Sequence, residues 1–182
     1  MDTDYIKIIG GHGQRQKWDY YPTPPECTIA LINFTKLPPD LVIWEPAAGE
    51  GHMADVIRRN GNKVIETDIQ TGHDFLTTPC PEGVNVIITN PPFSKSVEFI
   101  RRCDELHKPF ALLLKSQYWH SAKRKPLFDE IRPTYVLPLT WRPDFLGKGA
   151  SMMDMIWCVW SLDARLNRVT YYQPLNKPAK EE

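Results

Sequence analysis

The chain has 182 residues, and its 22 Lys or Arg and 22 Asp or Glu residues give a formal net charge of zero. A neutral chain has no overall basic field, so contact with nucleic acid would have to come from a local patch. Hydrophobic residues make up 42% of the chain, as in ordinary globular proteins. No apolar run is long enough to cross a bilayer, and no secretion signal is recognisable. We therefore expect a cytoplasmic protein with no membrane partner.

The predicted elements alternate between helices and strands along most of the chain. Residues 1–19 are glycine-rich and polar and predict a flexible arm, 20–175 predict a single domain, and 176–182 predict a flexible tail. Helices are predicted at 24–35, 52–61, 94–107 and 123–131. Strands are predicted at 41–45, 63–67, 84–89, 110–115, 134–139, 155–160 and 169–173.

This alternation predicts an α/β fold, in which helices cover both faces of a mostly parallel sheet. The last strands follow one another without a helix between them, which predicts an antiparallel addition at one sheet edge. In open sheets of this kind, ligands bind at the carboxyl ends of the strands. Functional residues are therefore expected just after the strands.

Cysteine and histidine are too scattered to predict a metal centre. The four cysteines have no C-x-x-C spacing, and the five histidines have no H-x-x-x-H spacing. These patterns argue against structural zinc and against a disulfide framework. We expect reduced, buried cysteines and no metal.

The sequence WEPAAGEGHMA follows the first predicted strand. Gly49, Gly51 and Ala54 fit G-x-G-x-x-A, which alone is a weak signal for a dinucleotide. Glu45 and Glu50 argue against one, because carboxylates repel a pyrophosphate. S-adenosylmethionine carries an ammonium and a sulfonium, and it would suit these acids better. A nicotinamide oxidoreductase remains the alternative interpretation.

Two further acids follow the second predicted strand. Asp68 lies near the distance expected for an acid that binds ribose hydroxyls. Asp74 could accept a hydrogen bond from an exocyclic N–H of adenine, and Phe75 could pack on the face of its ring. These residues would complete a nucleoside site beside the glycine loop.

The third predicted strand ends at Asn90, which two prolines and a phenylalanine follow. The Asn90 amide oxygen and the Pro91 carbonyl can present two acceptors to one NH₂ group, and Phe93 offers a face for stacking. Acceptors that pull on the hydrogens of a conjugated amine free its lone pair for attack on a methyl sulfonium. Such transfer needs positioning and electrostatics rather than a catalytic histidine or cysteine. A base inside a duplex would first have to be flipped out.

These segments, in this order, resemble S-adenosylmethionine-dependent amino-methyltransferases, and small phage-type DNA adenine-N6 methyltransferases in particular. The similarity spans roughly residues 20–160. NPPF at 90–93 is similar to the catalytic motif of that family, EPAAGEG at 45–51 to its cofactor motif, and YYPTPP at 20–25 to the segment that closes over the cofactor. If a phage encodes the chain, the expected location is the cytoplasm of the host cell.

The resemblance implies a Rossmann-like class I methyltransferase fold, with a seven-stranded sheet and a terminal antiparallel hairpin. It implies S-adenosylmethionine as the cofactor. The catalytic residues that it implies are Asn90, Pro91, Pro92 and Phe93. The cofactor-binding residues are Tyr21, Pro22, Thr23, Glu45, Pro46, Ala47, Gly49, Gly51, Asp68, Ile69, Asp74 and Phe75.

The chain departs from sequence-specific relatives in having little room for a target-recognition region. Only residues 115–125 and 142–154 mix basic and aromatic side chains as a surface for a nucleic-acid backbone would. The candidate nucleic-acid contacts are Lys115, Lys123, Arg124, Lys125, Trp141, Arg142 and Lys148. Specificity could therefore be loose, use single strands, or need a second subunit, and we expect a monomer or a homodimer.

The expected activity is methyl transfer to the N6 amino group of adenine in DNA. The Asn-Pro-Pro-aromatic motif also occurs in enzymes that methylate adenine in RNA or a glutamine amide, since all of these substrates present a planar, conjugated NH₂. Phe93 favours a nucleobase, because glutamine modifiers resemble the variant that ends in Tyr. A non-catalytic nucleic-acid-binding module is a further alternative, against which the intact NPPF motif argues.

Overall fold

A computed structural model of the chain describes residues 21–147, 149, 153–161 and 169–179. The predicted arm at 1–19 and the last three residues of the predicted tail lie outside these described residues. Within them, no helix is long and apolar enough to cross a membrane.

Seven strands form one sheet in the order β2-β1-β3-β4-β6-β5-β7. The strands are β1 (Val42–Glu45), β2 (Lys63–Glu66), β3 (Val86–Thr89), β4 (Phe110–Lys115), β5 (Tyr135–Pro138), β6 (Met155–Trp160) and β7 (Tyr171–Tyr172). Each lies within a run that the sequence predicts as a strand. The α/β fold with a seven-stranded, mostly parallel sheet is therefore confirmed.

The antiparallel strand lies inside the sheet rather than at its edge. β6 runs antiparallel to both β4 and β5, whereas β7 pairs parallel to β5 and forms the edge. The expected antiparallel hairpin is thus β5 with β6, but its position differs from the prediction. The reason is burial: five of the six residues of β6 are buried, whereas both tyrosines of β7 are exposed. A strand that is apolar on both faces gains most from a central place, with neighbours on both sides.

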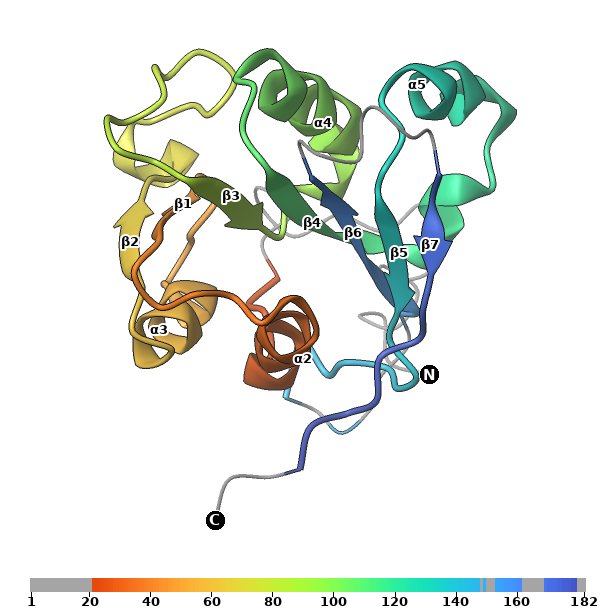
Figure 1. Cartoon of the computed structure of the whole chain (residues 1–182), viewed down its shortest axis with the longest axis horizontal. Coiled ribbons are helices and arrows are strands. Elements are labelled where there is room, and N and C mark those ends of the chain that lie inside the picture. The colour runs from red at the N-terminus through yellow and green to blue at the C-terminus, as the bar shows by residue number, and fades with distance from the viewer. Residues whose placement is uncertain (1–20, 148, 150–152, 162–168, 180–182) are drawn as a thin grey trace.

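Helices cover both faces of the sheet, as expected. They are α2 (Pro25–Thr35), α3 (His52–Arg59), α4 (Ser96–Glu105) and α5 (Lys125–Glu130). In Figure 1, α2 and α3 lie on one side of the sheet, and α4 and α5 lie on the other. Short 3-10 helices η2 (Ile69–Thr71), η3 (Phe93–Lys95), η4 (Ser116–Trp119) and η5 (Ala122–Arg124) follow strand ends or precede helices.

The alternation of side chains along the strands produces two hydrophobic cores. In β1, Ile43 packs with α2 and α3, whereas its neighbour Trp44 packs with α4 on the other face. In β3, Ile88 and Ile87 divide between the cores in the same way. Successive strand residues point to opposite faces, so a strand buried on both sides must be apolar throughout.

This arrangement brings three loops to one end of the sheet. β1 pairs parallel with both β2 and β3, so their carboxyl ends lie side by side. The glycine loop at 46–51, the acidic segment at 67–74 and the NPPF motif therefore converge, although they are separated in sequence.

Candidate active site

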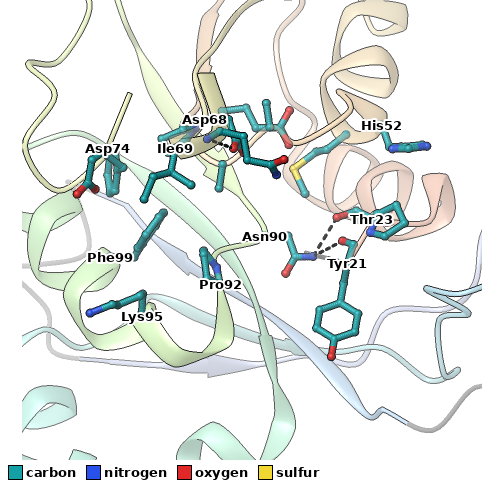
Figure 2. A pocket seen from close by; sticks show the side chains of 18 of the residues that line it. Tyr21, Thr23, His52, Asp68, Ile69, Asp74, Asn90, Pro92, Lys95 and Phe99 are labelled. Carbon is teal, nitrogen blue, oxygen red and sulfur yellow. Dashed lines mark hydrogen bonds between the residues drawn. The ribbon is translucent and has the colours of Figure 1, made fainter. Parts of the chain in front are cut away.

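A cavity opens where the predicted cofactor and catalytic segments meet (Figure 2). It lies at the carboxyl ends of β1, β2 and β3, and the segment before α2 forms one of its walls. Its lining residues are Tyr21, Pro22, Thr23, Glu45, Pro46, Ala47, Ala48, His52, Met53, Asp68, Ile69, Gln70, Asp74, Phe75, Leu76, Asn90, Pro92, Lys95 and Phe99. Most of the predicted cofactor residues belong to this set.

Glu45 is the last residue of β1 and places a carboxyl group in the wall of the cavity. The residue is only 2% exposed, and its Oε2 atom is buried without a hydrogen-bond partner. Burial raises the pKa of Glu45 to about 8, against the opposing effects of the Ala54 N–H and Arg58. A buried carboxyl group with an unsatisfied oxygen favours a cationic or N–H-donating ligand.

The two glycines of the loop shape this wall from behind, whereas Pro46, Ala47 and Ala48 of the same loop line it. Gly51 adopts φ +80°, and a Cβ atom there would lie 2.8 Å from the Glu66 carboxylate, so a larger residue would strain this position. Gly49 also has positive φ, and its N–H donates to Asp68 Oδ2 over 2.9 Å. Gly49 and Gly51 are thus not among the lining residues, and their role is to set the course of the loop into α3.

Asp68 ties the loop after β2 to the loop after β1. The residue is 8% exposed, and its other carboxylate oxygen accepts from the Gln70 N–H over 2.8 Å. Both oxygens are therefore engaged with backbone groups. Each carboxylate oxygen can accept a second hydrogen bond, so the predicted contact with ribose hydroxyls is compatible with this geometry.

Phe75 is less accessible to a ligand than the sequence predicts. Phe75 lines the cavity but is only 2% exposed, because its ring packs 5.1 Å from Trp44 and 4.7 Å from Phe99 between ring centroids. Little of its face is available to a ligand. Ile69 is 46% exposed and extends into the cavity in the direction of Phe99 (Figure 2). Ile69 is thus the more accessible apolar surface for a planar ring.

Asp74 lines the cavity beside these side chains. Its Oδ1 atom accepts from the Leu76 N–H over 3.0 Å, and its carbonyl accepts from the Thr77 and Thr78 N–H groups. Asp74 therefore caps the turn that follows it. The other carboxylate oxygen, Oδ2, remains compatible with the predicted bond to an exocyclic N–H.

Asn90 directly follows β3, and both polar ends of its amide lie in defined places. Its Nδ2 donates to the Tyr21 carbonyl over 3.2 Å and to the Thr23 hydroxyl over 3.1 Å. Its Oδ1 is buried and has no hydrogen-bond partner. In Figure 2 this oxygen points away from Tyr21 and Thr23, toward the side on which Pro92 lies.

The rest of the NPPF motif divides between the cavity and the core. Pro92 lines the cavity, whereas Pro91 is buried and Phe93 is partly buried, and neither lines it. The Phe93 ring stacks on Tyr21, with centroids 5.4 Å apart, and the Lys115 ammonium lies 4.3 Å from the centroid of the same ring. A base that stacked on Phe93 would have to accommodate these two neighbours.

Several of the predicted nucleic-acid contacts interact with neighbouring groups of the protein. Arg124 donates to the Tyr118 carbonyl and lies over its ring, and Arg142 donates to Asp154 over 2.8 Å. Lys125 pairs with Asp129 in α5, and Lys123 is exposed.

The two other predicted contacts are Trp141 and Lys148. Trp141 is partly buried against the core on the α2 side, and its indole N–H has no hydrogen-bond partner. Lys148 lies outside the described residues. The role of these side chains in nucleic-acid binding stays a prediction.

Several lining residues escaped the sequence interpretation. His52 and Met53 begin α3 directly after the glycine loop, and Lys95 and Phe99 follow the NPPF motif. Their positions next to recognised motifs are a signal that could have identified them. Among the described residues, no group of three or more His, Cys, Asp or Glu side chains could hold a metal ion.

Comparisons with known proteins identify the fold. No protein-family model matches the sequence, and no curated protein matches it. Solved structures do match. A protein of Pyrococcus horikoshii described as a proposed RNA methyltransferase is 16% identical, with a TM-score of 0.63, over 88% of this chain and 96% of that one.

Two further structures support the same conclusion. A proposed class I S-adenosylmethionine-dependent methyltransferase of Listeria monocytogenes is 12% identical, with a TM-score of 0.62, over 96% of this chain and 74% of that one. The methyltransferase subunit of a type I restriction-modification system from Streptococcus thermophilus is 15% identical, with a TM-score of 0.63, over 94% of this chain and 51% of that one. The protein therefore has the class I methyltransferase fold.

Proposed function

We propose that the protein transfers a methyl group from S-adenosylmethionine to the exocyclic N6 amino group of adenine in DNA. The observation that carries this proposal is the Asn90 amide, whose Oδ1 is a buried acceptor without a partner beside the cavity. A buried polar atom without a partner costs free energy, so it is expected to gain one when a ligand binds.

The orientation of Asn90 restricts the kind of group that can serve as this partner. A carbonyl can only accept, so the amide end that faces the Tyr21 carbonyl must be the NH₂. Both Nδ2 hydrogens are then used by Tyr21 and Thr23. Only the oxygen is left for a substrate, which must therefore donate an N–H or O–H. This favours an amino group over the keto oxygen of guanine or thymine.

Access to this oxygen requires a local movement. The oxygen is buried from water, so a substrate amine can reach it only after neighbouring side chains shift. A flipped base, whose insertion displaces side chains, fits this requirement.

The cavity fits the proposed cofactor at three points. The unpartnered Glu45 oxygen suits an ammonium group, Asp68 retains accepting capacity for ribose hydroxyls, and Ile69 offers an exposed apolar surface to an adenine ring. When bound, the cofactor would supply the electrophilic methyl group. The contribution of the chain is to bind the cofactor, to exclude water and to orient the acceptor amine. The class I methyltransferase fold argues against the nicotinamide alternative.

Adenine in RNA is the second candidate substrate. One structural neighbour is described as a proposed RNA methyltransferase and another as a subunit of a DNA restriction-modification system. Both polymers present the same amine, so the Asn90 geometry does not distinguish them. The formal net charge of zero and the anchored arginines give no preference for a duplex. We favour DNA because of the similarity of the motifs to small DNA adenine methyltransferases.

Transfer of labelled methyl groups would test the proposal. The protein is incubated with labelled S-adenosylmethionine and, separately, with single-stranded DNA, duplex DNA, RNA and cell protein, and the products are digested to nucleosides. We expect N6-methyladenine in DNA. Label in RNA alone would move the substrate to the second candidate, and label in protein alone would end the nucleobase proposal.

The Asn90→Ala variant tests the catalytic assignment. Removal of one preorganised hydrogen-bonding group, an oxyanion-hole donor, typically costs about 10²–10³-fold in rate, and we expect a loss of at least this size for the Asn90 acceptor. Affinity for S-adenosylhomocysteine should change by less than about threefold, because the cofactor contacts remain and uniform binding is retained. Activity that survived the substitution would refute the assignment.

A further inference from the structure

The catalytic amide is joined to a segment far from it in the sequence. Asn90 follows β3, whereas Tyr21 and Thr23 precede α2, and the two hydrogen bonds between them span 69 and 67 positions. These bonds use the backbone of one partner and the side chain of the other. A substitution at position 23 can therefore remove one bond and leave the other in place.

The two acceptors have different consequences for Asn90. The Tyr21 carbonyl determines which end of the amide is the NH₂, because a reversed amide would place two oxygens against each other. The Thr23 hydroxyl oxygen accepts the hydrogen bond from the second N–H of Asn90. With one bond alone, the amide could still rotate about the remaining contact. With both, its plane is determined, and so is the direction of Oδ1.

The surroundings of Thr23 make it suited to this task. It is 6% exposed and lies between Pro22 and Pro24, which restrict the backbone on both sides. Little backbone entropy is therefore lost when this segment is ordered. Thr23 also lines the cavity, so the same residue contacts both the cofactor pocket and the catalytic amide.

We propose that Thr23 is a positioning residue, whose hydroxyl holds the Asn90 amide so that Oδ1 is aimed at the substrate amine. This inference rests on the proposed methyl transfer. It assigns the hydroxyl to Asn90 rather than to the cofactor, to which the sequence resemblance assigns Thr23.

The test compares Thr23→Val, which replaces the hydroxyl by a methyl of similar size, with Thr23→Ser, which keeps it. Thr35→Val, the same change at the end of α2 and outside the cavity, is the control. Single-turnover methyl transfer to DNA is measured at saturating cofactor, and affinity for S-adenosylhomocysteine is measured by calorimetry. Thermal unfolding monitors folding of each variant.

We expect Thr23→Val to transfer methyl groups about tenfold more slowly, the effect of losing one neutral hydrogen bond, with cofactor affinity within about threefold. Thr23→Ser and Thr35→Val should stay within about threefold of the wild type in rate. Equal losses in the Val and Ser variants, or a loss of cofactor affinity as large as the loss of rate, would overturn the positioning role.

A substrate-free measurement separates this inference from the proposed function. The side-chain NH₂ signals of Asn90 are assigned in an NMR spectrum by their absence from Asn90→Ala. In Thr23→Val, one of these hydrogens should exchange with water at least about tenfold faster, whereas in Thr23→Ser it should not. A wild type inactive on every substrate overturns the proposed function alone. Asn90 signals that do not respond to Thr23→Val overturn the positioning role.

Discussion

The protonation of Glu45 should be coupled to cofactor binding. Its carboxyl group has a pKa of about 8 because it is buried, so at pH 7 it is protonated in about 90% of molecules. Asp55 and Asp68 raise the pKa further, whereas the Ala54 N–H and Arg58 lower it. An ammonium group bound beside the unpartnered Oε2 would favour the ionised form. Binding of S-adenosylhomocysteine at pH 7 should therefore release up to about 0.9 proton from this group.

The sign of the pH dependence follows from the same pKa. Below about pH 8, ionisation must accompany binding, so affinity should rise with pH by up to about tenfold per unit. Above about pH 8, Glu45 is already ionised in the free protein, and its contribution to the pH dependence should vanish. Calorimetry in buffers of different ionisation enthalpy measures the protons released at each pH.

Two variants identify the residue that releases the proton. Glu45→Gln keeps the shape of the side chain but cannot ionise, so its affinity should lose this pH dependence. His52 also lines the cavity, and His52→Gln should retain the release if Glu45 is the source. A wild type that releases no proton at pH 7, or a Glu45→Gln protein that releases as many as the wild type, would refute the reasoning.

Three further measurements probe the site and the core. Ile69→Ser should weaken binding of S-adenosylhomocysteine about tenfold, the cost of roughly 1–1.5 kcal/mol of lost apolar contact, and unchanged affinity in calorimetry would show that Ile69 does not contact the ligand. Trp157→Phe removes the 2.8 Å bond from its indole N–H to the buried Cys27 carbonyl and should lower the free energy of unfolding in urea by about 1–3 kcal/mol. A loss no larger than that of the exposed control Tyr172→Phe would contradict this. Because ionised Glu45 is disfavoured in the fold, wild-type stability should fall as pH rises from about 4.5 to 8, whereas Glu45→Gln should lack that slope.

The sequence predicts where the strands lie along the chain better than it predicts which strands pair with one another in the sheet. Each strand is marked by a continuous apolar run because both of its faces are buried, as Ile43 and Trp44 illustrate in β1. Sheet order depends instead on backbone pairing between distant segments, for which such runs contain no signal. The same apolar pattern of β6 is compatible with several places in the sheet, and only packing on both sides selects the one between β4 and β5.

The site shows the same division between local and distant information. The loops after β1, β2 and β3 were predicted to converge because parallel strands deliver their carboxyl ends to one edge. The exposure of individual rings was not predictable, because Phe75 is covered by Trp44 and Phe99 from other elements. The bonds from Asn90 to Tyr21 and Thr23 also join residues that no local pattern links.

The two unpartnered oxygens of the cavity support a common interpretation. Among the described residues that line it, buried side-chain atoms without a hydrogen-bond partner occur in Glu45 and Asn90. The Asn90 oxygen is an acceptor, and the Glu45 oxygen is one once the carboxyl group ionises. Buried acceptors of this kind destabilise the free protein unless a donor reaches them. A cavity that lacks donors at two separate points is complementary to ligands that donate at both. In the proposed reaction the cofactor ammonium would be the donor at Glu45, and the amine to be methylated would be the donor at Asn90. The two unpartnered oxygens would then both lower the stability of the free protein and contribute to its affinity for the two ligands.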